Sequence, residues 1–170
     1  AQRIDALLIT ALAHLALIDP AVATIDENQL HDDAAGAALQ IQGGIIVGAE
    51  ALTLNSDGIG GTGALRNISG NNSWSGTITL GSASTIASDA GTLTLSGALN
   101  TGANALTLNT ASSSTVSING TLTGSGGLTV TGSSSTGTAI LSADNSATFS
   151  GSITLARGKL SLGHASALGS

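Results

Sequence analysis

The chain lacks cysteine and methionine, contains one proline, and has only two aromatic residues among its 170. Without cysteine it can form no disulfide and carry out no thiolate chemistry. Without large rings, its core must be built from leucine, isoleucine, valine and alanine. Hydrophobic residues still make up 41% of the chain and the mean hydropathy is positive. We therefore expect an ordered protein with a thin, elongated core.

Positive charge is also scarce, because the chain has only four lysines and arginines. Residues 1–57 hold eight acidic groups against one arginine, a net charge of −7. Residues 58–170 hold two acidic groups against three basic ones, a net charge of +1. There is no basic stripe, and Trp74 and Phe149 are the only aromatic residues on which bases could stack. These features argue against nucleic-acid binding.

The N-terminal segment has the pattern of an amphipathic helix. Its apolar residues recur at the spacing of one helical face until Pro20 ends the run: Ile4, Leu7, Leu8, Ala11, Leu12, Leu15 and Ile18. The apolar stretch of residues 6–18 is too short to span a bilayer. It also resembles the core of a signal peptide, but Asp5 is unusual in such a leader, and we favour an ordered helix.

From about Ala37 the hydrophobic period changes from 3.6 to 2, which predicts β-strands. Short runs place two aliphatic residues on one face, at residues 39–42, 52–54, 78–80, 93–95, 106–108, 116–118, 128–130, 153–155 and 160–162. Clusters of glycine, asparagine and serine between these runs are typical of tight corners. We therefore divide the chain into an N-terminal cap with an acidic linker, residues 1–36, and a repeat domain, residues 37–170.

Two internal repeats support a solenoid. The positions Trp74, Gly76, Ile78 and Leu80 recur further along the chain as Phe149, Gly151, Ile153 and Leu155. The run at positions 51–55 recurs at positions 105–109. Both spacings suit whole numbers of coils of roughly 18–27 residues, so the two aromatic residues are predicted to be equivalent. An antiparallel β-sandwich is the alternative, because frequent turn signals also mark that fold.

The two ends of such a solenoid are predicted to differ. A solenoid exposes unpaired strand edges at each end. The helix of residues 1–18 is suited to cover the first coil through Leu8, Leu12 and Leu15. Nothing similar follows residues 160–162, so we expect the last coil to be cut from something longer or covered by another subunit.

These residues resemble the autotransporter-associated β-strand repeat of secreted bacterial proteins. The resemblance rests on Asn145 to Leu155, on Gly158 to Gly163, on the closing Ala167 to Ser170, and on Gly91 to Gly97. It covers about residues 37–170 and implies a right-handed parallel β-helix, surface display or secretion, and roles in adhesion, aggregation or matrix building. Residues 1–35 depart from the repeat, and the family's translocator barrel is absent from this sequence.

Residues that could carry chemistry are few. His31, Asp32 and Asp33, with Asp26 and Glu27 close by, form the only titratable cluster, without the glycine-bearing spacing of a calcium loop. His14 and His164 each lack a second histidine at metal-ligand spacing. Successive Thr-x-Thr pairs follow one another at unequal intervals, too irregular for one ladder of the kind that binds ice. We expect no enzyme activity, no metal and no cofactor.

The sequence thus predicts an all-β, right-handed parallel β-solenoid with a short N-terminal capping helix. We expect a structural or adhesive protein, extracellular or on a bacterial surface, that associates with itself end to end or laterally. A module that binds glycans or host-surface proteins is one alternative. A polysaccharide-degrading β-helix is another, although such enzymes need clustered carboxylates.

Overall fold

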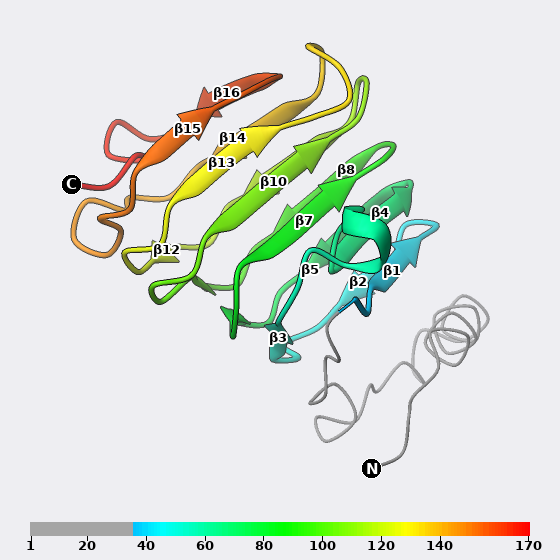
Figure 1. The fold of residues 1–170 in the computed structure, drawn as a ribbon, viewed down its shortest axis with the longest axis horizontal. Coiled ribbons are helices and arrows are strands. Elements are labelled where there is room, and N and C mark those ends of the chain that lie inside the picture. The colour runs from blue at the N-terminus through cyan, green and yellow to red at the C-terminus, as the bar shows by residue number, and fades with distance from the viewer. Residues whose placement is uncertain (1–35) are drawn as a thin grey trace.

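The computed structural model describes residues 36–170, which form a parallel β-solenoid without an α-helix (Figure 1). Every pairing between its strands is parallel. The predicted solenoid is therefore confirmed, and the antiparallel sandwich is wrong. The predicted helix of residues 1–18, with Leu8, Leu12 and Leu15, lies outside the described residues.

The strands form three sheets. Sheet A has six strands, in the order β1 (Leu39–Gln42), β4 (Leu65–Ser69), β7 (Ser84–Ser88), β10 (Leu106–Thr110), β13 (Leu128–Thr131) and β15 (Ile153–Leu155). Sheet B has six, in the order β2 (Ile46–Val47), β5 (Asn71–Trp74), β8 (Thr92–Leu95), β11 (Thr115–Ile118), β14 (Thr138–Leu141) and β16 (Lys159–Leu162). Sheet C has four, namely β3 (Leu52–Leu54), β6 (Ile78–Leu80), β9 (Leu99–Asn100) and β12 (Leu122–Thr123).

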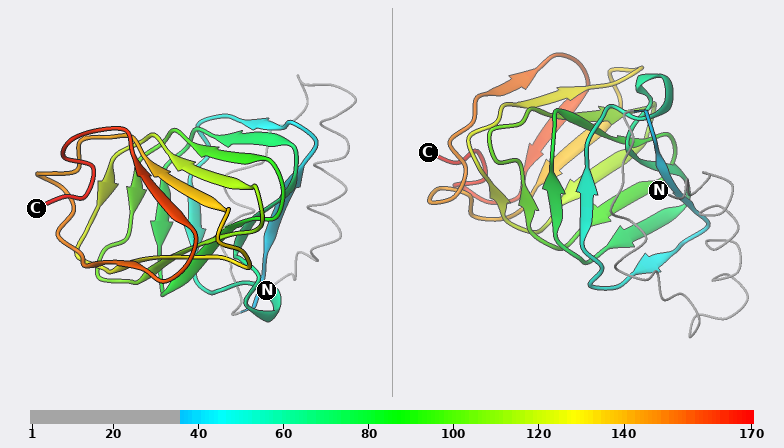
Figure 2. Two further views of the ribbon diagram at one scale, coloured as in Figure 1. Left: turned by 90° about the horizontal axis from the view of Figure 1, so that it is seen from above. Right: turned by 60° about the horizontal axis from the view of Figure 1, so that its bottom comes forward.

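The chain passes through sheet A, then sheet B, then sheet C, and returns to sheet A one level further along; only between β14 and β15 does it return without a strand in sheet C. Coils therefore stack in sequence order, as the progression from blue to red shows (Figure 2). One short 3-10 turn, η1 (Ile59–Gly61), belongs to the long corner between β3 and β4. This arrangement places the last coil, with β15 and β16, at one end of the stack.

The core consists of aliphatic columns that run along the stack. In sheet A, residues in register form the column Leu39, Leu65, Ile86, Leu108, Val130 and Leu155. In sheet B, the corresponding column is Val47, Trp74, Leu95, Ile118, Leu141 and Leu162. The inner members of both columns are fully or almost fully buried. Aliphatic side chains thus fill a narrow interior, as the composition predicts, and Trp74 is the one aromatic member of the two columns.

Glycine marks corners where successive coils lie too close for a side chain. A Cβ on Gly76 would lie 1.7 Å from the carbonyl oxygen of Glu50, and one on Gly97 would lie 2.0 Å from that of Gly76. Gly120 occupies the same corner one coil further along, where a Cβ would lie 2.0 Å from the carbonyl oxygen of Gly97. A Cβ on Gly151, at a different corner, would lie 2.0 Å from the carbonyl oxygen of Gly126. Both repeat glycines are therefore required by close approach of backbone between coils.

The predicted equivalence of the two aromatic residues is wrong. Trp74 ends β5 and pairs with Leu95 in sheet B, whereas Phe149 forms a bridge with Gly124, directly after β12 of sheet C. The strands that follow are displaced in the same way, because β6 belongs to sheet C and β15 to sheet A. Both rings are nonetheless buried, with exposures of 0% and 1%.

The second internal repeat shows the same displacement. Residues 52–54 form β3 in sheet C, and residues 106–108 belong to β10 in sheet A. Both internal repeats therefore relate neighbouring faces of the solenoid, and their spacings do not correspond to whole numbers of coils. The physical reason is that each face uses the same strand pattern, with two inward aliphatic residues flanking one outward hydroxyl.

Candidate functional site

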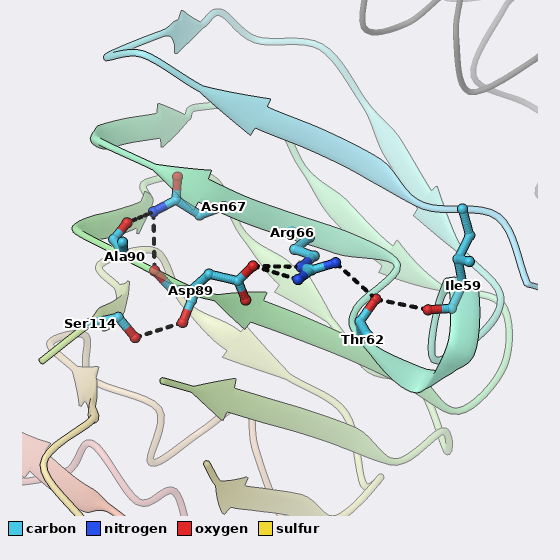
Figure 3. Close-up of polar contacts among 8 residues, drawn as sticks. Ile59, Thr62, Arg66, Asn67, Asp89, Ala90 and Ser114 are labelled. Carbon is cyan, nitrogen blue, oxygen red and sulfur yellow. Dashed lines mark hydrogen bonds and ion pairs between the residues drawn. The ribbon is translucent and has the colours of Figure 1, made fainter. Parts of the chain in front are cut away.

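An ion pair ties the long corner of the first coil to the outer face of sheet A (Figure 3). The Arg66 guanidinium donates from Nε to Asp89 Oδ2 at 2.8 Å and from Nη1 to Thr62 Oγ1 at 3.2 Å. The Thr62 hydroxyl in turn donates to the carbonyl oxygen of Ile59 at 2.8 Å. Because the pair is partly exposed, it contributes at most about 1 kcal/mol to stability. We interpret this ion pair, together with the Thr62 hydrogen bonds, as contacts that hold the η1 corner against sheet A.

A buried polar network lies at the corner between sheets A and B. Asn67 Nδ2 donates to Ser88 Oγ and to the carbonyl oxygen of Ala90, both at 3.0 Å (Figure 3). Asn72 Nδ2 donates to Asn67 Oδ1, and Asn72 Oδ1 accepts from the Ile45 amide at 2.6 Å. Asn67 and Asn72 are 0% and 2% exposed. Such groups are costly to bury unless paired, and here they bond between coils, so their role is structural.

A third buried asparagine, Asn145, replaces strand pairing near the last coil. The chain around Asn145 forms no regular strand, yet Asn145 is only 1% exposed. Its Oδ1 accepts from the Leu122 amide at 2.8 Å, and its Nδ2 donates to the carbonyl oxygen of Ala167 at 2.7 Å. One side chain therefore connects the coil below to the coil above, which accounts for asparagine at the start of the repeat-like segment.

The titratable groups near the C-terminus, Asp144 and His164, make hydrogen bonds within their own turns. Hydrogen bonds from the Ser146 amide and hydroxyl hold the pKa of Asp144 below its ordinary value, with a weaker contribution from the charge of His164. His164 Nδ1 accepts from the Ser166 amide at 3.1 Å, an ordinary turn contact. Because the Asp144 carboxylate is fully exposed, its ionisation has little effect on the free energy of unfolding.

No group of three or more histidine, aspartate or glutamate side chains that could hold a metal ion occurs within residues 36–170. Of the carboxylates described, Asp89 is paired with Arg66, and Asp144 is held by Ser146 in a different corner. The predicted acidic cluster around His31 and the lone His14 lie outside the described residues. In the same range, no helix has the length and hydropathy needed to cross a membrane.

Threonines form columns on the outer faces that the sequence reasoning missed. In sheet A, the register stacks Thr85, Thr107, Thr129 and Thr154, of which Thr85 is buried at 7% exposure. In sheet B, it stacks Thr92, Thr115 and Thr138. Each column contains one threonine from each of several successive coils. The two members of a Thr-x-Thr pair, in contrast, lie on one strand. Aligning successive coils of the sequence by the first residue of each strand would have placed these threonines in one column.

The last coil leaves apolar side chains uncovered. Leu155 in β15 is 53% exposed and Leu162 in β16 is 47% exposed, although both occupy inward columns. Leu168 nearby is 44% exposed. The sequence pattern indicated Leu155 as a repeat position. Exposed apolar side chains at an open strand edge are typical of an interaction surface.

Comparison of the chain with protein-family models, with curated proteins and with solved structures finds no match.

Proposed function

We propose that this chain is a structural segment of a bacterial surface or secreted protein that elongates by adding further coils to its open end. An extracellular location, an adhesive role, a right-handed coil and membership of the autotransporter-associated repeat belong to the same proposal. The observation that carries it is the last coil, where inward-facing Leu155 and Leu162 stay about half exposed. Burying such side chains under another coil is favourable, at about 25 cal/mol for each Å² of apolar surface.

The rest of the described chain is consistent with a rod. Backbone hydrogen bonds connect each coil to the next, as in the bonds from the Leu39 amide to Ala64 and from the Ala64 amide to Thr85, at 2.7 and 2.8 Å. The outer face carries hydroxyl groups with few charges. A rod of this kind can hold other parts of a protein apart or form part of a matrix.

The test is sedimentation velocity across a concentration series, followed by negative-stain electron microscopy. We expect the sedimentation coefficient to rise with concentration and the images to show rods longer than one chain. A Leu155→Asp variant should lose this association, because it places a charge where a coil must pack. Its matched control is Thr154→Asp, which adds the same charge to the outer face of the same strand. A wild-type chain that stays monomeric throughout would contradict the proposal.

The location is tested separately. In the organism that makes the protein, an antibody against the chain should label intact cells or detect the protein in the medium. Labelling only after lysis would contradict display or secretion.

A second candidate function is glycan binding. The specific observation that favours it is the threonine columns, which repeat hydroxyl groups at the strand spacing of about 4.8 Å. A glycan array probed with the chain tests this function. A signal that Thr92→Val, Thr115→Val and Thr138→Val remove together would support it, and an array without signal would exclude it.

A further inference from the structure

Two residues beyond the aliphatic column of sheet A, three inner strands place a polar side chain in the core. Asn67 in β4, Ser88 in β7 and Thr110 in β10 face one another in register. Their exposures are 0%, 1% and 0%, so none of the three reaches solvent. We call these three residues the polar column. It lies where sheet A leads into the corner with sheet B.

The polar column is hydrogen-bonded from coil to coil. Asn67 Nδ2 donates to Ser88 Oγ at 3.0 Å, in the coil that follows. The carbonyl oxygen of Ser88 accepts from Ser114 Oγ at 2.6 Å, again one coil further along (Figure 3). Thr110 Oγ1 makes a longer bond, 3.4 Å, to the carbonyl oxygen of Thr131 in the coil after that. Side-chain hydrogen bonds inside this corner therefore connect successive coils.

The aliphatic columns do not by themselves fix how two coils line up. The second coil consists of β4, β5 and β6, and the third consists of β7, β8 and β9. Because side chains alternate between the faces of a strand, a slide by two residues keeps the same side chains inward. Consider a slide that pairs each residue of the second coil with the residue two positions earlier in the third. It would pair Trp74 with Leu93, where Trp74 now faces Leu95, and Leu80 with Leu99. In sheets B and C, apolar side chains would thus still face each other.

The lengths of the corners do not oppose this slide. In all three sheets, partners in the second and third coils have the same separation in the sequence, as in Asn67 with Ser88, Ser73 with Thr94, and Thr79 with Asn100. All strands of one coil can therefore move together. The corner glycines are a feature that does depend on register, because Gly97 lies against the carbonyl oxygen of Gly76.

The polar column distinguishes the two registers. After the slide, Asn67 would lie against the aliphatic side chain of Ile86. Its Nδ2 would lose both Ser88 Oγ and the carbonyl oxygen of Ala90 as acceptors. A buried amide that loses its partners costs far more free energy than the exchange of one apolar contact for another. The shifted register is therefore unfavourable because of its hydrogen bonds.

We propose that the polar column sets the register between the second and third coils, with Asn67 as the residue that makes the shifted register unfavourable. The aliphatic columns then supply most of the stability, and the polar column selects which of two apolar arrangements forms. This inference does not depend on the proposed function, because it concerns packing within one chain.

Pairs of cysteines within one full-length chain report the register. Ser73→Cys with Thr94→Cys joins residues that face each other at the strand spacing of about 4.8 Å. Ser73→Cys with Thr92→Cys joins residues about 8 Å apart, beyond the Cα separation of about 4.4–6.8 Å that a disulfide requires, and only the slide brings them opposite each other. Each variant is oxidised after folding, and the chain has no native cysteine to interfere. Mass spectrometry measures the linked fraction.

With the polar column intact, we expect the pair at positions 73 and 94 to link and the pair at positions 73 and 92 to stay reduced. Replacing the column by apolar residues, Asn67→Leu with Ser88→Ala, should raise the yield of the second link about tenfold. One unsatisfied buried polar group is enough to account for that factor. Ser88→Ala alone changes the shape of the core least and should raise the yield by a smaller factor.

Leu99→Ala is the matched control, because it removes a fully buried side chain from the third coil and leaves the polar column intact. We expect it to lower the Tm and to keep the link between positions 73 and 94 alone. Circular dichroism checks that each variant is folded. If the polar-column variants give only that link, the corner glycines suffice to fix the register and the inference is overturned. An equal yield of the shifted link in Leu99→Ala would attribute the slide to lost stability and would overturn it as well.

Discussion

At the scale of single residues, the position of a side chain along the stack of coils determines how deeply it is buried. Leu108 and Leu155 belong to one inward column, yet Leu108 is 0% exposed and Leu155 is 53% exposed. The difference arises because Leu108 has a coil on either side of it, whereas Leu155 has a described coil on one side alone. Burial in a solenoid is therefore a property of neighbouring coils.

This contrast predicts different costs for the same substitution. Leu108→Ala should lower the free energy of unfolding by about 3 kcal/mol, because it leaves a cavity in a packed core. Leu155→Ala should lower it by less than about 1 kcal/mol, because half of that side chain is already in water. Urea denaturation of the two variants, at concentrations where the chain is monomeric, measures the difference. Equal costs would contradict the exposure assigned to the last coil.

The corner glycines make a second prediction at this scale. Gly97→Ala should destabilise the chain by about 1–3 kcal/mol, because its Cβ would lie 2.0 Å from the carbonyl oxygen of Gly76. Gly48→Ala is the matched control, since a Cβ there meets no atom within 4 Å. Neither glycine has a positive φ, so the comparison isolates the close approach of coils from backbone strain. Thermal unfolding followed by circular dichroism gives both values, and a stable Gly97→Ala variant would contradict the close packing of this corner.

At the scale of elements, the sequence predicted the strands with inward aliphatic pairs and missed those with inward polar or small residues. The nine predicted runs all coincide with strands, including β1, β6 and β15. The missed strands include β4, β5 and β7. Their inward positions hold Asn67, Asn72 and Ser88, and Asn67 bonds both to Asn72 in its own coil and to Ser88 in the next coil. No local pattern reveals the bond from Asn67 to Ser88, because Ser88 lies one coil further along the chain.

One element prediction concerns the N-terminal segment. Residues 1–18 are predicted to form a helix that covers the first coil. Replacing Leu8, Leu12 and Leu15 together by serine should then expose the first coil and speed the hydrogen exchange of β1. Hydrogen exchange followed by mass spectrometry measures the protection of residues 39–42.

The control for this variant is Ala6→Ser, Thr10→Ser and Ala13→Ser, which changes the opposite face of the same predicted helix. We expect residues 39–42 to be protected in it as in the wild-type chain. Loss of protection in the control and not in the leucine variant would place the apolar stripe away from the first coil.

At the scale of the whole molecule, stability is distributed along the stack. Each coil contacts only its neighbours, so a coil at the end is held from one side and an inner coil from both. The sequence predicted this architecture from composition and strand pattern. It did not predict the order of faces, because both internal repeats suggested whole coils where the chain in fact moves on by one face. The right-handed sense remains a prediction from the resemblance.

The uneven support along the stack predicts a gradient of local opening. Amides of β10 and β11, in an inner coil, should exchange hydrogen more slowly than amides of β15 and β16 in the last coil. Hydrogen exchange followed by mass spectrometry, on dilute monomeric protein, measures the gradient. Exchange that is equally slow in β15 and β16 would contradict an open last coil. Assembly at high concentration should slow exchange in β15 and β16 more than in the inner strands.

The displacement of the internal repeats by one face also bears on how this chain tolerates changes in its length. Because all three faces follow one strand pattern, removing a strand together with its corner moves every later strand to the neighbouring face. The inward aliphatic residues still point inward after this rotation, and the parallel ladders can form again with new neighbours. Related chains can therefore gain or lose a third of a turn and remain solenoids, whereas a globular core would have to be rebuilt.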